Sequence, residues 1–356
     1  MQADKDILDF IVIGAPKAGT TSLFEYLRHH PEVSLPSGKE EQFFSHDAVY
    51  ARGWSAYLDD LTRHRFEGAA ADPARKWGTV TPQYMVGGVF KSTAGDAVRN
   101  GYDERTVPLR MRERLPDVRL IACLRDPVER ALSHHRMAVM LGRERQSFDE
   151  AIDELLRSDV LERARRDPEE RKDNRGYVAW SEYGRILGGY FDVFPAEQVL
   201  VVFTSELASA PVQLLGRVEE FIGVRADFAP ENLDKRFRTG KILRGFSWRS
   251  PSSWLSPSSP VSPQGVRRAL AGSASARAIW HAIPPAPRRR IARPYERLTV
   301  RAVRWNRRHP PNEIKANAKP SPETIARLRE HFREDTERLV ALIGEAPPWQ
   351  APGGAE

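Results

Sequence analysis

The sequence predicts an α/β fold in which helices flank a central parallel sheet. Three short, mostly apolar segments lead to this prediction: residues 10–14, 119–124 and 198–203. Each has the length and composition of a buried strand. Helical patterns lie between them, and strands that are separated by helices form parallel sheets with the helices packed on their faces.

A glycine-bearing loop joins the first predicted strand to the first predicted helix. Residues 10–14 end at Gly14. Residues 20–30 then place apolar side chains on one helical face, and Pro31 ends the helix. The loop therefore leads from a strand directly into the N-terminus of a helix.

The second predicted strand also leads into a helix. Asp126 and Pro127 follow residues 119–124, with aspartate as the N-cap and proline at the first helical position. The third strand, residues 198–203, follows a turn at residues 194–197.

One more helix is predicted close to the end of the sequence. Residues 321–324 have the composition of a helix start, and Gly344 is a typical helix end. The apolar residues between them recur at helical spacing: Ile325, Leu328, Phe332, Leu339, Leu342 and Ile343. We expect one domain over residues 1–356, within which residues 247–309 form a variable insertion or cap rich in proline, serine and arginine.

Composition limits the class of protein. Hydrophobic residues make up 40% of the 356 residues and charged residues 29%, which suits a folded globular chain. The single cysteine, Cys123, excludes an intramolecular disulfide and a cysteine-based zinc site. The first residues lack a signal-peptide pattern, and no apolar run approaches the roughly 18 residues that a membrane helix needs. We therefore expect a soluble, cytoplasmic protein.

The net charge of +7 has a local origin. Residues 288–308 hold nine arginines and one acidic residue, Glu296, so the rest of the chain is close to neutral. A basic stretch of this kind binds an anionic substrate, a membrane surface or nucleic acid, or it is a solvated helix face. Peripheral contact with a membrane surface stays open, and nucleic acid is the partner that we expect least.

The loop at residues 14–22 has the features of an anion-binding site. Backbone N–H groups that precede a helix, together with the positive end of the helix dipole, attract phosphate. Gly19 allows a close backbone approach, and three hydroxyl side chains follow it. A nucleotide-triphosphatase loop has lysine directly after its second glycine, whereas Thr20 takes that place here and the lysine is Lys17. A kinase built on this loop is an alternative that the moved lysine disfavours.

A second candidate anion site follows the second strand. Arg125 stands at the carboxyl end of residues 119–124, where open parallel sheets bind ligands. Ser133 lies about two turns into the next helix and adds a hydroxyl donor. Two phosphate sites on neighbouring strands suit a nucleotide with phosphates on both sides of its ribose.

Both sites resemble motifs of the sulfotransferases that use 3′-phosphoadenosine 5′-phosphosulfate (PAPS). The similarity is greatest to the branch that contains the heparan sulfate N- and 3-O-sulfotransferases and many bacterial relatives. Pro-Lys-x-Gly-Thr-Thr-Ser-Leu at residues 16–23 is similar to their 5′-phosphosulfate loop, and Arg-Asp-Pro-x-x-Arg-x-x-Ser at residues 125–133 to their 3′-phosphate motif. The resemblance implies the P-loop-like sulfotransferase fold. It also implies a set of nucleotide-binding residues: Lys17, Ala18, Gly19, Thr20, Thr21, Ser22, Arg125 and Ser133.

The resemblance further implies two catalytic residues. Lys17 contacts the bridging oxygen and the sulfuryl group in the family pattern. Residues 39–44, Lys-Glu-Glu-Gln-Phe-Phe, resemble the segment whose glutamate is the proposed base, which gives Glu40 that role. His134 and His135 are rival bases, because histidine titrates near neutrality. We rank them below Glu40, since they stand beside the predicted nucleotide site.

Other segments have a family counterpart as well. Residues 79–84 resemble a segment that ends in Thr-Pro-x-Tyr and helps line the acceptor cleft. Phe43 and Phe44 are expected to pack their segment against the core. In the family a late loop closes over the 3′-phosphate, and residues 241–245 and 315–319 are both candidates.

The sequence therefore predicts a transferase of the PAPS-dependent sulfotransferase type. It would move a sulfuryl group from PAPS to a hydroxyl or amine of a carbohydrate, lipid or natural-product acceptor and release adenosine 3′,5′-bisphosphate. No metal is expected, because lysine, arginine and backbone donors meet the phosphates. The alternatives are a nucleotide-dependent kinase and a protein that binds polyanions or membrane surfaces through residues 288–308.

Overall fold

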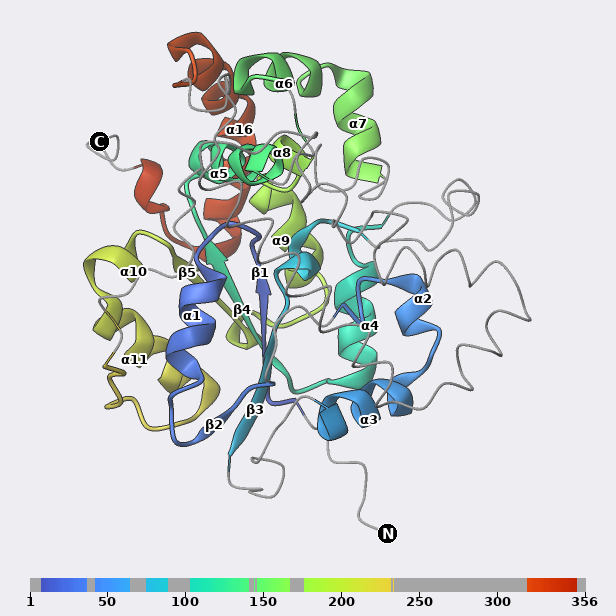
Figure 1. Cartoon of the computed structure of the whole chain (residues 1–356), viewed down its shortest axis with the longest axis vertical. Helices are drawn as coiled ribbons and strands as arrows, with labels where there is room; N and C mark the ends of the chain where they lie inside the picture. The colour runs from blue at the N-terminus through green and yellow to red at the C-terminus, as the bar shows by residue number, and fades with distance from the viewer. Residues whose placement is uncertain are drawn as a thin grey trace, which may run out of the picture. The chain divides into compact units, whose positions relative to one another are not determined.

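A five-stranded, all-parallel sheet forms the centre of the fold in the computed structural model (Figure 1). Its strand order is β2-β3-β1-β4-β5. The strands are β1 (Phe10–Gly14), β2 (Val33–Ser34), β3 (Lys76–Val80), β4 (Arg119–Leu124) and β5 (Val199–Phe203). The structure confirms the predicted α/β class and the predicted bounds of β1 and β4, and β5 begins one residue later than predicted.

The structure describes most of the chain outside its late arginine-rich part. The described residues are 8–36, 42–64, 75–88, 103–140, 144, 146–166, 176–231, 233 and 319–350. Among the predicted features that lie outside them are the insertion at residues 247–309 and the arginine-rich stretch at residues 288–308.

By its internal contacts the chain divides into two compact units. The first unit, which contains the whole sheet, holds residues 1–134, 149–239 and 320–356. The second holds residues 135–148 and 240–319, and its described part includes the end of the helix that follows β4. The single domain over residues 1–356 stays a prediction.

Helices follow the strands along the chain. Those in the first half of the chain are α1 (Thr20–Leu27), α2 (Asp47–Tyr50), α3 (Trp54–His64), α4 (Thr106–Arg114), α5 (Pro127–Met140), α6 (Phe148–Leu155) and α7 (Ser158–Arg166), with the 3₁₀ helix η1 (Pro82–Met85). Those in the second half are α8 (Gly176–Ala179), α9 (Tyr183–Phe191), α10 (Glu206–Ser209), α11 (Pro211–Ile222) and α16 (Pro322–Ile343), with the 3₁₀ helices η2 (Ala196–Gln198) and η4 (Pro348–Gln350). Within the described residues, none of the helices is both long enough and apolar enough to cross a membrane.

The two faces of the sheet are buried in two separate apolar clusters. Successive side chains of a strand point to opposite faces, so Ile11 and Ile13 of β1 join one cluster and Phe10 and Val12 the other. The first cluster includes apolar residues of α3, α4, α9 and α16, and the second includes those of α1 and α11. The sheet is thus the middle of three layers, which explains why its central strand is apolar along its whole length.

A close contact inside the sheet requires a glycine in β3. Gly78 pairs with Phe10 of β1, and a Cβ atom at Gly78 would lie 2.2 Å from the Phe10 ring. The segment Lys76–Val80 begins with lysine and contains this glycine, so it lacks the apolar run that predicts a strand. Its pairing with β1 makes it a strand, which its sequence pattern does not predict.

The first helix is shorter than predicted. The expected helix over residues 20–30 ends at Leu27 in the structure. The amides of His29 and His30 bond to carbonyl oxygens three residues earlier, at 3.2 and 3.0 Å, so the chain tightens into turns before Pro31.

The last helix, α16, has the predicted start and end. The Ser321 hydroxyl accepts a hydrogen bond from the Thr324 amide at 3.1 Å, and Gly344 ends the helix with φ 74°. α16 packs closely on α9, because a Cβ atom at Gly184 would lie 2.2 Å from the Asp335 carbonyl oxygen. The Asp335 carboxylate accepts hydrogen bonds from the amides of Gly184 and Arg185, both at 2.8 Å, so α16 caps the start of α9.

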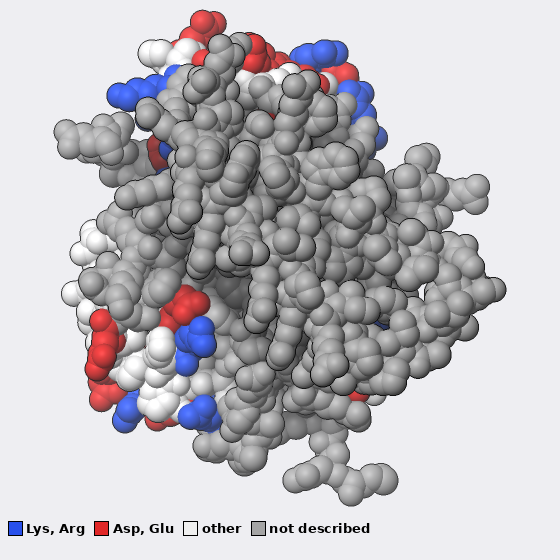
Figure 2. All heavy atoms as spheres, viewed as in Figure 1, with Lys and Arg blue, Asp and Glu red and all other residues white. Residues whose placement is uncertain are grey.

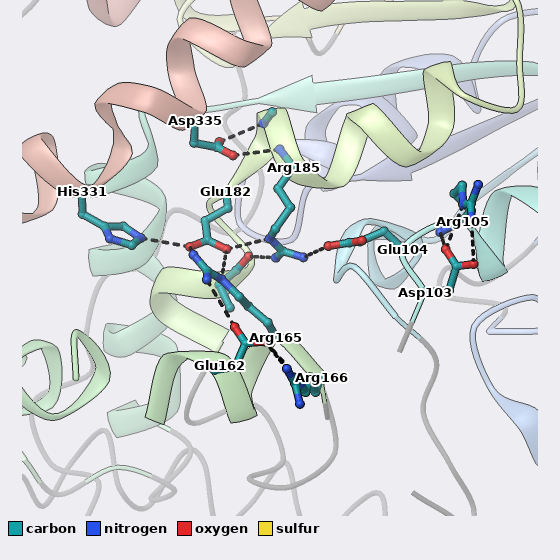
Figure 3. A network of polar contacts seen from close by, with 12 residues as sticks. Asp103, Glu104, Arg105, Glu162, Arg165, Arg166, Glu182, Arg185, His331 and Asp335 are labelled. Atoms are coloured by element: carbon teal, nitrogen blue, oxygen red, sulfur yellow. Dashed lines mark hydrogen bonds and ion pairs between the residues drawn. The ribbon is translucent and has the colours of Figure 1, made fainter. Parts of the chain in front are cut away.

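A buried carboxylate next to this cap joins three helices (Figure 3). The side chain of Glu182 is only 2% exposed and accepts hydrogen bonds from Arg165 at 2.6 Å, Arg185 at 2.7 Å and His331 at 3.0 Å. Burial alone would raise the pKa of Glu182, but the hydrogen bonds from His331 and Arg165 and the charge of Arg185 outweigh it and hold the pKa at about 2. The turn between α8 and α9 is therefore fixed to α7 and α16 by ionic hydrogen bonds.

Exposed charges of the described residues mix in sign. On the face shown in Figure 2, acidic and basic side chains alternate over the region of α6 and α16 and over that of α10 and α11. Several of them form ion pairs, for example Arg333 with Glu330 at 2.9 Å and Arg217 with Glu206 at 2.8 Å. Such pairs are typical of a solvated surface and contribute little stability.

Glu219 on α11 is a buried carboxyl group of a different kind. Its Oε1 lies 4.0 Å from Nε2 of His30, and its Oε2 has no hydrogen-bond partner within the described chain. Nδ1 of His30 accepts a hydrogen bond from the Glu32 amide at 3.1 Å, which is the pattern of a neutral imidazole. Burial, together with the charge of Asp227, raises the pKa of Glu219 to about 7.

We predict that Glu219→Gln removes a loss of stability at high pH. The raised pKa means that the folded state prefers protonated Glu219, so its stabilising effect is complete below the ordinary pKa of 4.5 and disappears as the pH rises through 7. A difference in pKa of this size between the folded and the unfolded state corresponds to about 3 kcal/mol in the free energy of unfolding. In urea unfolding experiments, the variant should lose less stability than the wild type between pH 5 and pH 8.5. Glu220→Gln, on the exposed face of the same helix, is the control, and equal losses in the wild type and the Glu219 variant would contradict the prediction.

Candidate functional site

The loop after β1 emerges at the carboxyl edge of the sheet. β1 ends at Gly14, and α1 begins at Thr20, so residues 15–19 form the connection. A Cβ atom at Gly14 would lie 2.5 Å from Cβ of Met85, and Gly19 has φ 91°. The two glycines are therefore required by close packing at the start of the loop and by left-handed backbone at its end.

Side chains beneath this loop bind its carbonyl oxygens. The Thr204 hydroxyl lies 2.7 Å from the Ala18 carbonyl oxygen, and Sγ of Cys123 lies at the same distance from it. Nη1 of Arg130 donates to the Pro16 carbonyl oxygen at 3.4 Å. Burial raises the pKa of Cys123 to about 12, so its thiol stays protonated and acts as a donor.

These contacts determine where the loop's N–H groups point. The Pro16–Lys17 and Ala18–Gly19 peptides are trans, so each carbonyl oxygen and the N–H of the same peptide point in opposite directions. Because the Pro16 and Ala18 oxygens are bound from below, the amides of Lys17 and Gly19 point to the other side of the loop. Lys17 has φ 72°, and alternation of such left-handed residues gathers successive N–H groups into an anion-binding concavity.

The N-terminus of α1 adds to this arrangement. The first amides of an α-helix point out of its N-terminus and carry a partial positive charge. Here α1 begins at Thr20, followed by Thr21 and Ser22, and the Ser22 amide donates to the Gly19 carbonyl oxygen at 2.9 Å. Thr20 is buried, whereas Thr21 and Ser22 are partly exposed. The loop and the helix N-terminus thus have the backbone arrangement of an anion site, and the binding of phosphate there stays a prediction.

The second candidate site lies beside the first. β4 is the hydrogen-bonded neighbour of β1, with Gly14 opposite Ala122, so the loop and Arg125 leave the sheet at the same edge. The structure confirms Asp126 as the cap of α5, since its carboxylate accepts a hydrogen bond from the Glu129 amide at 2.9 Å. Nη2 of Arg125 lies 2.7 Å from a carboxylate oxygen of Glu129, and both side chains are partly exposed. An anion that binds Arg125 would therefore compete with an exposed, weakly held ion pair.

The two histidines that rival Glu40 as base are buried. His134 is 0% exposed, and its ring stacks on Trp180 with ring centroids 5.0 Å apart. His135 is 1% exposed, and burial lowers its pKa. Neither imidazole can reach an acceptor without leaving the interior. Glu40 lies outside the described residues, so its role stays a prediction.

The segment that follows residue 41 is anchored by aromatic side chains. Phe43 and Phe44 are 1% and 0% exposed, as expected from the sequence. Phe43 stacks on Tyr57 of α3 with ring centroids 4.5 Å apart, and Phe44 packs against Tyr84 at 5.7 Å. Tyr84 is itself 1% exposed, so this residue of the Thr-Pro-x-Tyr segment belongs to the core. Of the late-loop candidates, residues 241–245 and 315–319, only Lys319 belongs to the described residues.

The sequence and the fold agree with known proteins. The model of the sulfotransferase family matches residues 9–228, well over half of the chain. The chain belongs to the sulfotransferase family. The matched range includes every strand of the described sheet and both candidate anion sites of this sulfotransferase.

Two enzymes of heparan sulfate are among its relatives. Human heparan sulfate glucosamine 3-O-sulfotransferase 3A1 is 27% identical over 250 residues, which cover 69% of this sulfotransferase and 50% of the human protein. The bifunctional heparan sulfate N-deacetylase/N-sulfotransferase of Drosophila melanogaster is 26% identical over 223 residues, which cover 61% of this sulfotransferase and 20% of the Drosophila protein. The chain therefore spans half or less of the length of these relatives. They confirm the branch that the motifs predicted.

A solved structure supports the fold. The sulfotransferase from Alicyclobacillus acidocaldarius is similar with a TM-score of 0.56 and 22% sequence identity, over 95% of this chain and 96% of that one. The similarity confirms the predicted sulfotransferase fold and extends over almost the full length of both chains.

The sequence assigned no role to two residues beneath the loop. Thr204 directly follows β5, and its place at the carboxyl end of a parallel strand is the signal that singled out Arg125. Arg130 lies inside the motif at residues 125–133. Its side chain is 0% exposed, donates to carbonyl and hydroxyl oxygens and lies 3.4 Å from Nδ1 of His134.

We predict that Thr204→Val weakens nucleotide binding by this sulfotransferase. The change keeps the side-chain volume and removes the donor to Ala18, so the Gly19 amide is held less firmly. The loss of one neutral hydrogen bond corresponds to a decrease of about two- to tenfold in affinity. Calorimetry with adenosine 3′,5′-bisphosphate measures it, with exposed Ser205→Ala as the control. An unchanged affinity in Thr204→Val would show that the hydroxyl does not position the loop.

Proposed function

We propose that the protein transfers a sulfuryl group from PAPS to a hydroxyl or amine of a carbohydrate. The observation that supports this most directly is the pair of anion-binding elements at the carboxyl edges of two adjacent strands, β1 and β4. One is a loop and helix N-terminus, and the other is Arg125 with α5. A nucleotide that carries a phosphate on each side of its ribose suits both at once, whereas a triphosphate needs one extended cradle.

The donor groups present fit the anionic ends of such a nucleotide. Gly19 has left-handed backbone, and a Cβ atom there would lie 2.8 Å from Cδ1 of Leu207, so only glycine leaves the loop in this form. In our proposal the 5′ end binds at residues 17–22 and the 3′-phosphate binds Arg125 and Ser133. PAPS supplies an activated sulfuryl group, and adenosine 3′,5′-bisphosphate is the product.

Two side chains would assist the transfer. The acceptor oxygen or nitrogen forms a bond to sulfur as the bond from sulfur to the bridging phosphate oxygen breaks. Lys17 would stabilise the negative charge that develops on that oxygen, and Glu40 would take the acceptor's proton. Catalysis by positioning and charge stabilisation is familiar from the related transfer of phosphoryl groups.

A carbohydrate acceptor is favoured by the relatives, because those we compared act, by name, on heparan sulfate or its glucosamine. A lipid or natural-product acceptor, a cytoplasmic location and membrane contact through residues 288–308 stay predictions from the sequence. The kinase alternative has less support, because Thr20 occupies the place of the phosphate-binding lysine.

We predict that adenosine 3′,5′-bisphosphate binds at least about tenfold more tightly than ATP, since only the former engages both sites, and tenfold equals about 1.4 kcal/mol. Calorimetry measures the affinity for both ligands with Mg²⁺ and with a chelator that removes it. The affinity for the bisphosphate should be the same under both conditions. Arg125→Ala should remove most of the preference. Arg105→Ala, which removes the same charge at an exposed residue that pairs with Asp103 at 3.1 Å, is the control. Equal or tighter ATP binding would overturn the proposed function.

We also predict that Glu40→Gln abolishes turnover but not binding. A general base contributes about 10²- to 10⁴-fold to the rate, so kcat should fall by at least about 100-fold. The affinity for adenosine 3′,5′-bisphosphate should stay within about twofold, because the amide has the same size and the nucleotide contacts lie elsewhere. Glu41→Gln is the matched control. A normal kcat in Glu40→Gln would show that another residue is the base.

A further inference from the structure

Arg130 differs from the other arginines of the described core. Its side chain is fully buried, yet none of the ion pairs in the described part of the chain includes it. By contrast, Arg165 and Arg185 reach the carboxylate of Glu182 at 2.6 and 2.7 Å. A buried charge without a counter-charge is costly, so its retention calls for a physical reason.

Four oxygen atoms surround the guanidinium group. Nη2 donates to the carbonyl oxygens of Gly176 and Tyr177, both at 2.8 Å, and Nε donates to the Ser181 hydroxyl at 2.5 Å. Nη1 donates to the Pro16 carbonyl oxygen at 3.4 Å and lies at the same distance from Nδ1 of His134. Three of the contacts with oxygen thus belong to the α8 region, and the fourth belongs to the candidate phosphate loop.

The α8 side of this arrangement is rigid. Ser181 directly precedes Glu182, whose carboxylate is bound by three cationic or imidazole groups from α7, α9 and α16 (Figure 3). The guanidinium is therefore held in place from one side and presents one N–H to the loop on the other. It stays protonated near neutral pH, because burial lowers the pKa of Arg130 only to about 10.

The contact with Pro16 affects the neighbouring amide. In the trans peptide between Pro16 and Lys17, the carbonyl oxygen faces Arg130 and the Lys17 N–H therefore faces away from it. A positive charge beside the carbonyl also polarises this peptide and strengthens the N–H as a donor. The same charge adds positive potential beneath the loop, in surroundings of low polarity where it is weakly screened.

We propose that Arg130 is a positioning residue for the donor nucleotide, which orients the Lys17 amide toward the 5′-phosphate end and finds its counter-charge there when the nucleotide binds. The inference rests on the proposed function, because it assumes that the loop binds this end of PAPS. It assigns no direct contact between Arg130 and the nucleotide.

The test separates the two ends of the nucleotide. Calorimetry gives the affinities of the full chain for adenosine 3′,5′-bisphosphate and for adenosine 3′-monophosphate, which lacks the 5′-phosphate. Arg130→Met should lower the affinity for the bisphosphate by about 10- to 100-fold, which is the effect of one hydrogen bond to a charged group. It should lower the affinity for the monophosphate by less than about threefold. Arg130→Lys, which keeps the charge but has a single nitrogen, should lie between Arg130→Met and the wild type.

Arg185→Met is the matched structural control. It removes another largely buried arginine of the same region, one that bonds to Glu182 and to the Ala179 carbonyl oxygen and not to the loop. It should lower the melting temperature and leave the ratio of the two affinities unchanged. All variants are compared at a temperature at which circular dichroism shows them folded. If Arg130→Met does not fold, Arg130→Lys decides the test by the same ratio.

Two outcomes would overturn the inference. The first is an unchanged ratio of the two affinities in the folded Arg130 variants, which includes the equal loss for both nucleotides that a purely structural role would give. The second is the same change of ratio in Arg185→Met. A wild-type protein that does not bind adenosine 3′,5′-bisphosphate would overturn the proposed function, and this inference with it.

Discussion

A trans peptide group cannot turn its carbonyl oxygen to one side without turning its N–H to the other, and the candidate site depends on this constraint. The oxygens of Pro16 and Ala18 are bound from within the protein by Arg130, Thr204 and Cys123. The loop's amides are therefore oriented before any ligand arrives, which spares the reorganisation that a flexible loop would need. The side chains that impose the orientation come from α5 and from the ends of β4 and β5.

The sheet brings these contributors together. Because β1, β4 and β5 are adjacent and parallel, the residues that follow them leave at one edge. The hydrogen bonds of Ala15 to the Cys123 carbonyl oxygen at 2.8 Å and of Thr204 to the Leu124 carbonyl oxygen at 2.7 Å extend this pairing beyond the strands. The loop is thus joined to the central sheet by backbone hydrogen bonds, and its geometry follows from the register of three strands.

The sequence predicted those features that local chemistry determines. Strands β1 and β4 have apolar runs, Asp126 and Ser321 have the side chains that cap helices, and Gly19 follows a strand. Features that depend on distant partners were not predictable in this way. β3 is a strand because Phe10 packs over Gly78, and Arg130 looks like a surface residue until the carbonyl oxygens of α8 surround it. Thr204 belongs to no motif, and only the strand order reveals its place beneath the loop.

The position of α16 in the chain has a consequence for the order of folding. All strands of the described sheet lie within the first 203 residues, but the groups that cap α9 and bind Glu182 come from Asp335 and His331, about 150 residues later in the sequence. Closing a chain segment of this length costs little more free energy than closing a shorter one, but such distant contacts form slowly. During synthesis the sheet can therefore assemble first, while the turn that holds Arg130 acquires its last partners only after residues 322–343 have emerged. The ability to bind the nucleotide would then be among the last properties that the growing chain gains.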